Sequence, residues 1–310
     1  MKSHKEAVEC YLALRRGLGF KLRSAGLALF DFAAFLDREH APHITNELAL
    51  RWAMLPRECQ PALWAARLRY VRGLARHCRA TDPRTEIPPE SLLPFRPGRA
   101  RPYLYSEQEI QRLLVAAAAL PSLDGLRGAT YSCLFGLLAV TGLRISEAIA
   151  LEVRDVDLRQ GVLTIRGAKF GKSRLVPLHV STQRVLARYA QRRDRLLGSS
   201  NPPRFLVNNY GRSLESSSVR RVFYRLSRQI GLRGPADRHG PRLHDFRHRF
   251  AVGTLMRWYR SGQDAERRLP VLSTYLGHAH IADTYWYLSA HPQLMGLAKR
   301  RLEKRWEIWP

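Results

Sequence analysis

The sequence predicts a mainly α-helical protein of two domains, the second of which is an α+β domain with a small β-sheet. Three observations support this fold class. The chain has 310 residues, enough for two domains that each bury a core. Apolar residues recur at helical spacing along most of its length. Two short apolar runs, 162–165 and 174–178, flank a glycine-containing turn and are expected to form a β-hairpin.

A segment rich in Pro, Gly and Arg divides the chain. Residues 81–102 contain repeated prolines, so this segment cannot sustain a helix or a sheet and is expected to be a linker. We therefore expect a helical domain at 1–80 and a second domain at 103–310. A helix at 293–306 is expected to end the second domain.

Four helices are expected in the first domain. Ser24 and Thr45 are placed to cap the second and the third. The fourth, at 61–79, is the most regular, and its apolar residues share one face. One residue along, the same helix carries a stripe of arginines: Arg69, Arg72, Arg76 and Arg79. This stripe is either a solvated flank or a face that contacts DNA phosphates, and the sequence leaves both interpretations open.

The charge balance points to a polyanionic partner. Lys and Arg number 52 against 26 Asp and Glu, which gives a net charge of +26 and a pI near 11.0. Codon bias would explain arginine in place of lysine, but not the twofold excess of basic over acidic residues. Nucleic acid is the polyanion that such a field favours most.

The sequence predicts a soluble protein of the bacterial cytoplasm. Its 4 cysteines lack the spacing of metal ligands and are expected to be reduced thiols. The first residues lead into an amphipathic segment rather than a signal peptide, and no apolar run reaches membrane-spanning length. We therefore expect no metal, no other cofactor and no membrane partner.

The stretch 243–287 carries the residues with the most specific chemistry. His244 and Arg247 are three residues apart, so on a helix they share one face and can reach a single anion. His278 and Tyr287 follow within a short segment. Two histidines, an arginine and a tyrosine without a carboxylate cluster suggest chemistry on a phosphate, with the tyrosine as nucleophile and no metal.

Two upstream elements add to this set. In the run TGLRISE a glycine ends one helix and Arg144 starts the next. An arginine at a helix start opposes the macrodipole, so Arg144 is expected to serve an anion or Glu147. The tip of the expected hairpin carries Lys169 and Lys172.

Taken in order, TGLRISE, a Lys-bearing hairpin ending in RLVPL, HDFRH, and LGH with a tyrosine nine residues on resemble the tyrosine recombinase (phage integrase) family. The resemblance covers about 103–290. It implies a four-helix core-binding domain followed by the catalytic domain. It also implies a site-specific recombinase or integrase that cleaves and rejoins double-stranded DNA through a 3′-phosphotyrosyl intermediate, without metal or ATP.

The resemblance implies a role for each motif residue. Tyr287 would attack the DNA phosphate. Arg144 and Arg247 would bind its non-bridging oxygens, where negative charge grows in the transition state. Glu147 would orient the arginines from behind.

Three further residues would donate hydrogen bonds or move protons. Lys169 would be the general acid that protonates the departing 5′ oxygen, and His244 would act as a base or as a hydrogen-bond partner of the phosphate. His278 would donate to a phosphate oxygen. Lys172 competes with Lys169 for the acid role and is otherwise expected to contact DNA, but alignment from the RLVPL strand favours Lys169.

Two neighbours compete with motif residues. Tyr285 is a second phenol beside Tyr287, but the nine-residue spacing from His278 favours Tyr287. His280 could replace His278 only if Gly277 did not end the preceding helix.

Other polar residues near the motifs have plainer interpretations. Asp245 is expected to be a cap or a structural partner, His248 to be packed or solvated, and His239 to lie in a loop. Asp283 and Thr284 stand where many members of the family carry a Thr-Thr pair, which is expected to alter only how the tyrosine helix sits.

The expected partner is double-stranded DNA at specific recombination sites. The apolar stripe of the helix at 293–306 is expected to dock on a neighbouring subunit in a homo- or hetero-tetramer on DNA, or to fold back on its own domain. The segment after Tyr287 is reminiscent of transposon-borne members. Two alternatives remain: a non-catalytic accessory homologue that binds DNA, and a strand transferase that resembles type IB topoisomerases.

Overall fold

The chain divides into two compact units, Met1–Ala100 and Arg101–Pro310, and the division falls within the Pro-rich segment 81–102. Each unit has its own buried apolar core. The computed structural model describes residues 3–93, 102–167, 173–198, 203–237, 240–289 and 292–306. Within these ranges, no helix combines the length and the apolar character that a membrane span requires.

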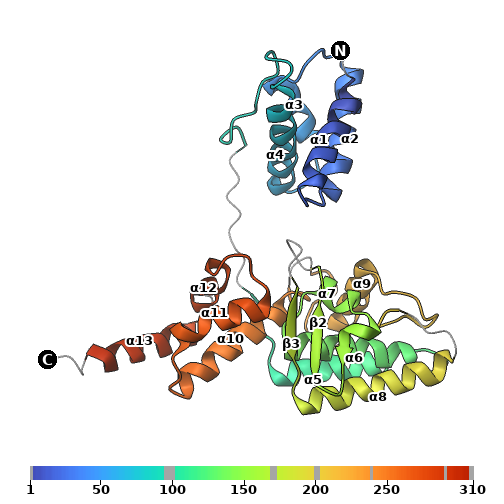
Figure 1. The fold of residues 1–310 in the computed structure, drawn as a ribbon, viewed down its shortest axis with the longest axis vertical. Helices are drawn as coiled ribbons and strands as arrows, with labels where there is room; N and C mark the ends of the chain where they lie inside the picture. The colour runs from blue at the N-terminus through green and yellow to red at the C-terminus, as the bar shows by residue number, and fades with distance from the viewer. Residues whose placement is uncertain are drawn as a thin grey trace. The chain divides into compact units, whose positions relative to one another are not determined.

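The described part of the first unit is built of four helices, in agreement with the sequence (Figure 1): α1 (His4–Gly17), α2 (Arg23–Arg38), α3 (Asn46–Met54) and α4 (Pro61–Cys78). The Thr45 hydroxyl caps α3 as predicted, because its Oγ1 accepts the Leu48 N–H at 3.2 Å. The predicted Ser24 cap is wrong. Because Leu22 turns into the left-handed region at φ 38°, α2 already begins at Arg23 and Ser24 lies inside its first turn.

The arginine stripe of α4 is divided between two roles. Arg72 donates from Nε to the Pro88 carbonyl at 2.6 Å and from Nη2 to the Pro89 carbonyl at 2.7 Å, so it holds the following segment against the helix. The other three arginines are exposed: Arg69, Arg76 and Arg79. On the neighbouring face, the predicted core positions Leu68 and Val71 are fully buried.

The second unit combines helices with one small antiparallel sheet, which confirms the predicted fold class. Its sheet has the order β1-β2-β3, and Leu163 of β2 pairs with Val176 of β3, both fully buried. The first elements of this unit are α5 (Glu107–Ala118), α6 (Leu126–Thr141), α7 (Ile145–Ala150), η1 (Val153–Asp155), β1 (Val156–Asp157), β2 (Val162–Ile165), β3 (Arg174–Pro177), α8 (Val180–Leu197) and α9 (Ser216–Gln229).

Local sequence explains the ends of the two helices that lead to the site. Ser106 and Glu109 form a reciprocal capping box at the start of α5. The buried helix α6 ends at Gly142, which adopts φ 62°. A Cβ there would meet the Phe250 ring at 2.8 Å, so only glycine fits both the backbone and the space.

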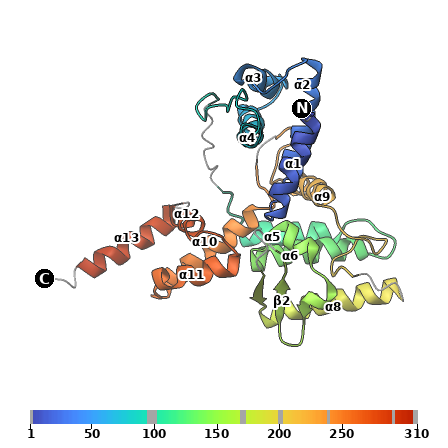
Figure 2. The same ribbon diagram turned by 45° about the horizontal axis from the view of Figure 1, so that its top comes forward.

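Four helices at the end of the chain form a second layer: α10 (Asp245–Arg260), α11 (Ala265–Leu276), α12 (Ala282–Ser289) and α13 (Pro292–Trp306). They enclose a separate apolar core that includes Leu255, Leu272 and Leu276, and α10 also packs against α6. Figures 1 and 2 show this group on one side of the unit and the sheet with α8 on the other, while α13 extends outward.

Candidate active site

The two motif arginines both bind the C-terminal end of α11. Arg247, on α10 and 1% exposed, donates from Nη1 to the Gly142 carbonyl at 3.0 Å and from Nη2 to the Leu276 carbonyl. Arg144, the residue before α7, donates to the Gly277 carbonyl at 3.2 Å and, more weakly, to that of Leu276 at 3.5 Å. The last carbonyls of a helix lack intrahelical partners and form the negative end of its dipole, so they attract guanidinium groups.

Glu147 is the carboxylate of this site, and it lies between two arginines. Its Oε1 accepts from Arg144 Nη1 at 2.9 Å and from Arg174 Nη1 at 3.1 Å. Its Oε2 accepts the Arg144 backbone N–H at 3.0 Å and Arg174 Nη2 at 2.8 Å. Burial alone would raise the pKa of Glu147, but the hydrogen bonds from Arg174 and Arg144 outweigh it and lower the pKa to about 2.

The electrostatics of the site suit an anion. Burial, followed by the charge of Arg144, lowers the pKa of Arg247 to about 10. The Arg247 guanidinium is therefore a cation that its surroundings do not fully compensate, and a bound phosphate would supply the missing negative charge.

His278 follows α11 directly and faces the nucleophile candidate. Its Nδ1 lies 2.7 Å from the hydroxyl of Thr284, which is fully buried in α12. Burial and the charges of Arg247 and Arg144 lower the pKa of His278 to about 4. Its imidazole is thus neutral near pH 7, and the Thr284 contact fixes the ring so that Nε2 remains to meet a substrate.

Tyr287 is buried, whereas the competing Tyr285 is not. The Tyr287 side chain is 2% exposed and lies between the rings of His278 and His248, with centroid distances of 6.0 and 5.5 Å. Tyr285 is 50% exposed. Burial raises the pKa of the Tyr287 phenol even though the charge of Arg247 and a hydrogen bond from it act in the opposite direction. The phenol is therefore protonated at neutral pH and needs a proton acceptor before it can attack.

His244 and His248 occupy the start of α10. His244 is at the surface, where partial burial and the charge of Arg247 lower its pKa. His248 is buried behind it, with its ring edge-on to His244 at 4.7 Å, and its Nδ1 has no hydrogen-bond partner among the described residues. Burial lowers the pKa of His248 to about 3. Of the two, only His244 can meet a substrate from solvent.

Of the remaining sequence-predicted residues, Asp245 and His280 fall outside this cluster. Asp245 is 1% exposed and binds Arg242 through both the backbone N–H and the guanidinium, so it is a structural partner. His280 is exposed beyond Gly277, which does end α11, at φ 66°. Lys169, Lys172 and His239 lie outside the described residues.

Two residues of the site were not singled out from the sequence. Arg174 opens β3 and reaches Glu147, which precedes it by 27 residues. The family pattern draws attention to Asp283 and Thr284 only as a departure, and it does not indicate that Thr284 is the partner of His278. A basic residue directly after a glycine-rich hairpin tip was the available signal for Arg174.

Glu147 makes the acid stability of this unit testable. Its folded pKa, about 2, lies below the ordinary value of 4.5, so its contribution to stability is present above pH 4.5 and is lost as the pH falls toward 2. The shift corresponds to about 3 kcal/mol of unfolding free energy. Urea unfolding of Glu147→Gln and wild type should therefore differ most near pH 7 and converge near pH 2.

A control variant separates this effect from a general loss of charge. Glu152→Gln removes a less buried carboxylate of the same unit and should change the unfolding free energy by less than about 1 kcal/mol at any pH. A difference between Glu147→Gln and wild type that stays constant from pH 7 to 2 would rule out the ion pairs as its cause.

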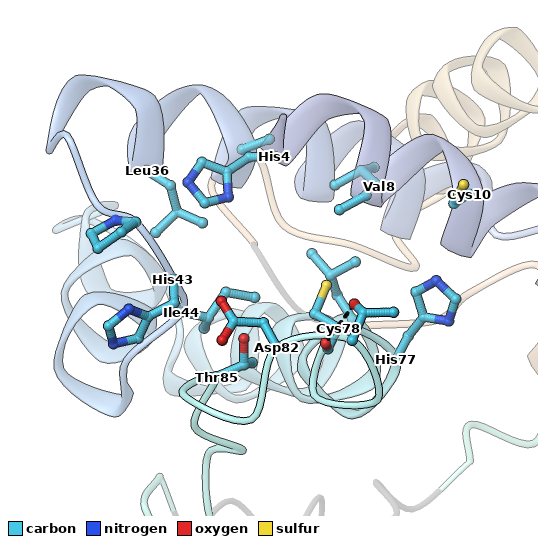
Figure 3. Close-up of a pocket in the computed structure, with 15 residues that line it drawn as sticks. His4, Val8, Cys10, Leu36, His43, Ile44, His77, Cys78, Asp82 and Thr85 are labelled. Atoms are coloured by element: carbon cyan, nitrogen blue, oxygen red, sulfur yellow. Dashed lines mark hydrogen bonds between the residues drawn. The ribbon is translucent and has the colours of Figure 1, made fainter. Parts of the chain in front are cut away.

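A separate cavity lies in the first unit and contains none of the candidate catalytic residues. It measures about 300 Å³ between α1, α2 and α4, with walls that include Val8, Leu36 and Ile44 (Figure 3). Two of its polar side chains are already bound, since the His4 ring contacts the Ala41 carbonyl and Asp82 pairs with Arg84. Among the described residues, no group of three or more His, Cys, Asp or Glu could hold a metal ion.

Comparison with known proteins assigns a family. Residues 104–293 match the model of the phage integrase family. A Sinorhizobium fredii protein named "Putative integrase/recombinase y4rB" is 57% identical, and the alignment covers 99% of each chain. Tyrosine recombinase XerD of Caulobacter vibrioides is 33% identical over 74% of this chain and 72% of its own.

Solved structures share the fold. The Tn1549 transposon integrase in complex with transposon right end DNA has a TM-score of 0.66 at 16% identity, covering 96% of this chain and 98% of that one. XerH site-specific recombinase bound to difH substrate, in a pre-cleavage complex, has a TM-score of 0.63 at 19% identity, covering 94% and 80%.

Proposed function

The chain belongs to the phage integrase family, and from this premise we propose that it is a site-specific DNA recombinase of the tyrosine type in the bacterial cytoplasm. It cleaves and rejoins double-stranded DNA through a 3′-phosphotyrosyl intermediate, without metal or ATP. The observation that supports this most is the convergence of two arginines, His278 and Tyr287 at the end of α11.

In the proposed cleavage step, the Tyr287 phenol oxygen attacks the scissile phosphorus. The bond from phosphorus to the 5′ oxygen breaks, and the phenol proton passes to His244 or to a phosphate oxygen. Lys169 protonates the departing 5′ oxygen. Ligation is the reverse, with a 5′ hydroxyl as nucleophile and Tyr287 as leaving group. The phosphodiester energy is kept in the covalent bond, so no nucleotide is consumed.

Arg144 and Arg247 act on the non-bridging oxygens. Charge on these oxygens grows as the pentavalent transition state forms, and two fixed guanidiniums stabilise it more than the ground state. His278, neutral and held by Thr284, donates from Nε2 to one of these oxygens. Glu147 keeps Arg144 in place through the 2.9 Å contact.

DNA affinity comes from phosphate contacts over a wider surface. Three exposed arginines of α4 and its C-cap (Arg69, Arg76 and Arg79) present a row of donors, and among the described residues their one ion pair is the 3.5 Å contact of Arg76 with Glu90. Lys172 is a further contact of the hairpin tip. Arg72 is tied to the chain's own carbonyls and contributes its charge alone.

We further propose that α13 joins subunits in a tetramer on DNA. Two points of the helix are fixed to its own unit, because Leu294 in the first turn is fully buried and Arg301, two turns further on, donates to the Gln263 carbonyl at 2.6 Å. The outer part is not covered: Leu302 is 45% exposed and Trp306 is 70% exposed. An apolar surface at the end of a projecting helix suits a groove on a neighbouring subunit.

Charged substitutions test the role of α13. The double variant Leu302→Glu and Trp306→Glu should still form a covalent adduct on a single site, but recombination between two sites should fall by about tenfold or more, because two charges cannot enter an apolar interface. Leu123→Glu, at a fully exposed leucine of the same unit, is the control and should recombine normally. Normal recombination by the α13 variant would assign the helix to its own unit alone.

A covalent trap tests the function itself. The full chain would select a duplex from a random-sequence library, and that duplex, labelled and nicked near its centre, would be incubated with the protein in EDTA. A labelled protein band on a denaturing gel, with the label mapped to a tyrosine, is expected. Tight binding without a band would favour the accessory homologue. Relaxation of supercoiled DNA without sequence preference would favour the topoisomerase-like enzyme.

A further inference from the structure

We propose that Arg174 is a positioning residue of the active site, which keeps Arg144 free to bind the phosphate. The inference rests on the proposed function and adds a residue to it. Arg174 is the first residue of β3 and is buried, with 8% of its side chain exposed. It does not touch the substrate. It acts through Glu147.

The two arginines hold Glu147 in different ways. Arg174 forms a two-pronged ion pair, with Nη1 on Oε1 at 3.1 Å and Nη2 on Oε2 at 2.8 Å. Arg144 reaches the same carboxylate with a single side-chain contact, from Nη1 at 2.9 Å. Because a carboxylate and a guanidinium prefer the two-pronged arrangement, Glu147 would turn toward Arg144 if Arg174 did not already occupy both oxygens.

The remaining donors of the two arginines differ accordingly. Arg174 also gives its Nε hydrogen to the Tyr275 carbonyl at 2.7 Å, so each of its three nitrogens is engaged. Arg144 has 23% of its side chain exposed, and among the described residues its Nη2 contacts only the Gly277 carbonyl, at 3.2 Å. The guanidinium that a phosphate can reach is therefore that of Arg144, and Arg174 is the support behind it.

The backbone is shaped to admit Arg174. Gly277 adopts φ 66°, and a Cβ at this position would meet Arg174 Nη1 at 2.7 Å. The absent side chain thus leaves room for the guanidinium against the end of α11. Arg174 donates to the Tyr275 carbonyl and Arg144 to the Gly277 carbonyl at the same helix end, and these contacts join β3, α7 and α11 at the phosphate site.

Inorganic phosphate binding tests the inference without any DNA cleavage. Phosphate-induced thermal shifts of the full chain would be compared for wild type, Arg174→Lys, Arg174→Gln and Arg144→Lys. Both Arg174 variants should bind phosphate about tenfold more weakly, because Glu147 then forms a two-pronged ion pair with Arg144 and competes with the phosphate. In the double variant Arg144→Lys and Arg174→Lys, the second change should add almost nothing to the loss from Arg144→Lys, since both act on one contact.

The control is Arg193→Lys, at an arginine that is 2% exposed and donates to Asp194 and to the Phe205 carbonyl, distant from this network. It should lower the melting temperature but leave phosphate affinity within about twofold of wild type. Circular dichroism at the assay temperature would confirm that each variant is folded.

Covalent adduct formation gives the second measurement. We expect Arg174→Lys to form the adduct about tenfold or more slowly while binding the duplex normally. If wild type forms no adduct but phosphate binding still depends on Arg174, the proposed function is wrong and the positioning role stands. Phosphate binding by both Arg174 variants like wild type, or losses that add fully in the double variant, would overturn the positioning role.

Discussion

Replacing Tyr287 by phenylalanine is expected to abolish the covalent protein–DNA adduct while leaving DNA affinity within about threefold of wild type. Without the phenol oxygen there is no nucleophile. Loss of a nucleophile lowers the rate of the chemical step by about four orders of magnitude or more. The substitution keeps the aromatic ring that packs between His278 and His248, so the fold should be preserved. The measurement is the labelled protein band in the covalent trap.

Tyr285→Phe is the matched control, because it removes the neighbouring phenol from the same helix. Tyr285 is 50% exposed and makes no ring contact with the histidines of the site among the described interactions. The Tyr285→Phe variant should therefore form the adduct at nearly the wild-type rate. A band that survives in Tyr287→Phe and disappears in Tyr285→Phe would identify Tyr285, and not Tyr287, as the nucleophile.

The burial of Tyr287 adds a pH dependence to this prediction. Because burial raises the pKa of the phenol, the phenolate is scarce at neutral pH, and the rate of adduct formation should rise with pH as the phenol loses its proton more readily. His244, whose pKa is lowered, is neutral and able to accept the proton at pH 7. His244→Gln should therefore lower the rate of adduct formation most at the lower pH values.

Local signals in the sequence were sufficient for much of the fold. Thr45 is predictable as a cap because a hydroxyl accepts from a backbone N–H three residues on, which requires only short-range information. Gly142 is predictable as a helix end because glycine enters the left-handed region without a steric penalty, which is also short-range information. The prediction of a Ser24 cap is wrong because Leu22, a residue with no turn preference, adopts a left-handed conformation. Nothing in the local sequence indicates that conformation.

Burial also produced a wrong strand prediction. The apolar run from Phe205 to Val207 predicts a brief strand, and all three residues are buried, but of the three only Val207 forms an isolated bridge, with Ser213. An apolar run reports that a segment is buried, and not that it has a partner for hydrogen bonding.

The chemistry of the site was predictable only in part. The order of the motifs predicts the side chains of the site. The groups that hold the arginines in place are backbone carbonyls at the end of α11, and a carbonyl has no signature in the sequence. Arg174 was missed because its partners are Glu147 and Tyr275, which are distant from it in the chain. Contacts of this kind depend on how β3, α7 and α11 pack, and no short pattern records that packing.

Arg247→Lys is expected to reduce adduct formation by about two to three orders of magnitude and also to destabilise the protein. The catalytic loss follows because an ammonium cannot match the two-pronged geometry of a phosphate, and removal of one transition-state donor typically costs about this factor. The measurement is the single-turnover rate in the covalent trap, at a temperature where circular dichroism shows the variant to be folded.

The loss of stability has a separate cause. Arg247 satisfies the Gly142 carbonyl and the Leu276 carbonyl at the same time from a site that is 1% exposed. A lysine can reach one of them at most, and a buried carbonyl left without a partner costs about 1–3 kcal/mol. Arg249→Lys on the same helix is the control, because Arg249 donates to the Tyr105 carbonyl and lies outside the arginine cluster. Arg249→Lys should therefore leave the rate nearly unchanged. If Arg247→Lys cleaves within about threefold of wild type, the guanidinium serves the fold alone, and Arg144 would have to carry the transition-state charge by itself.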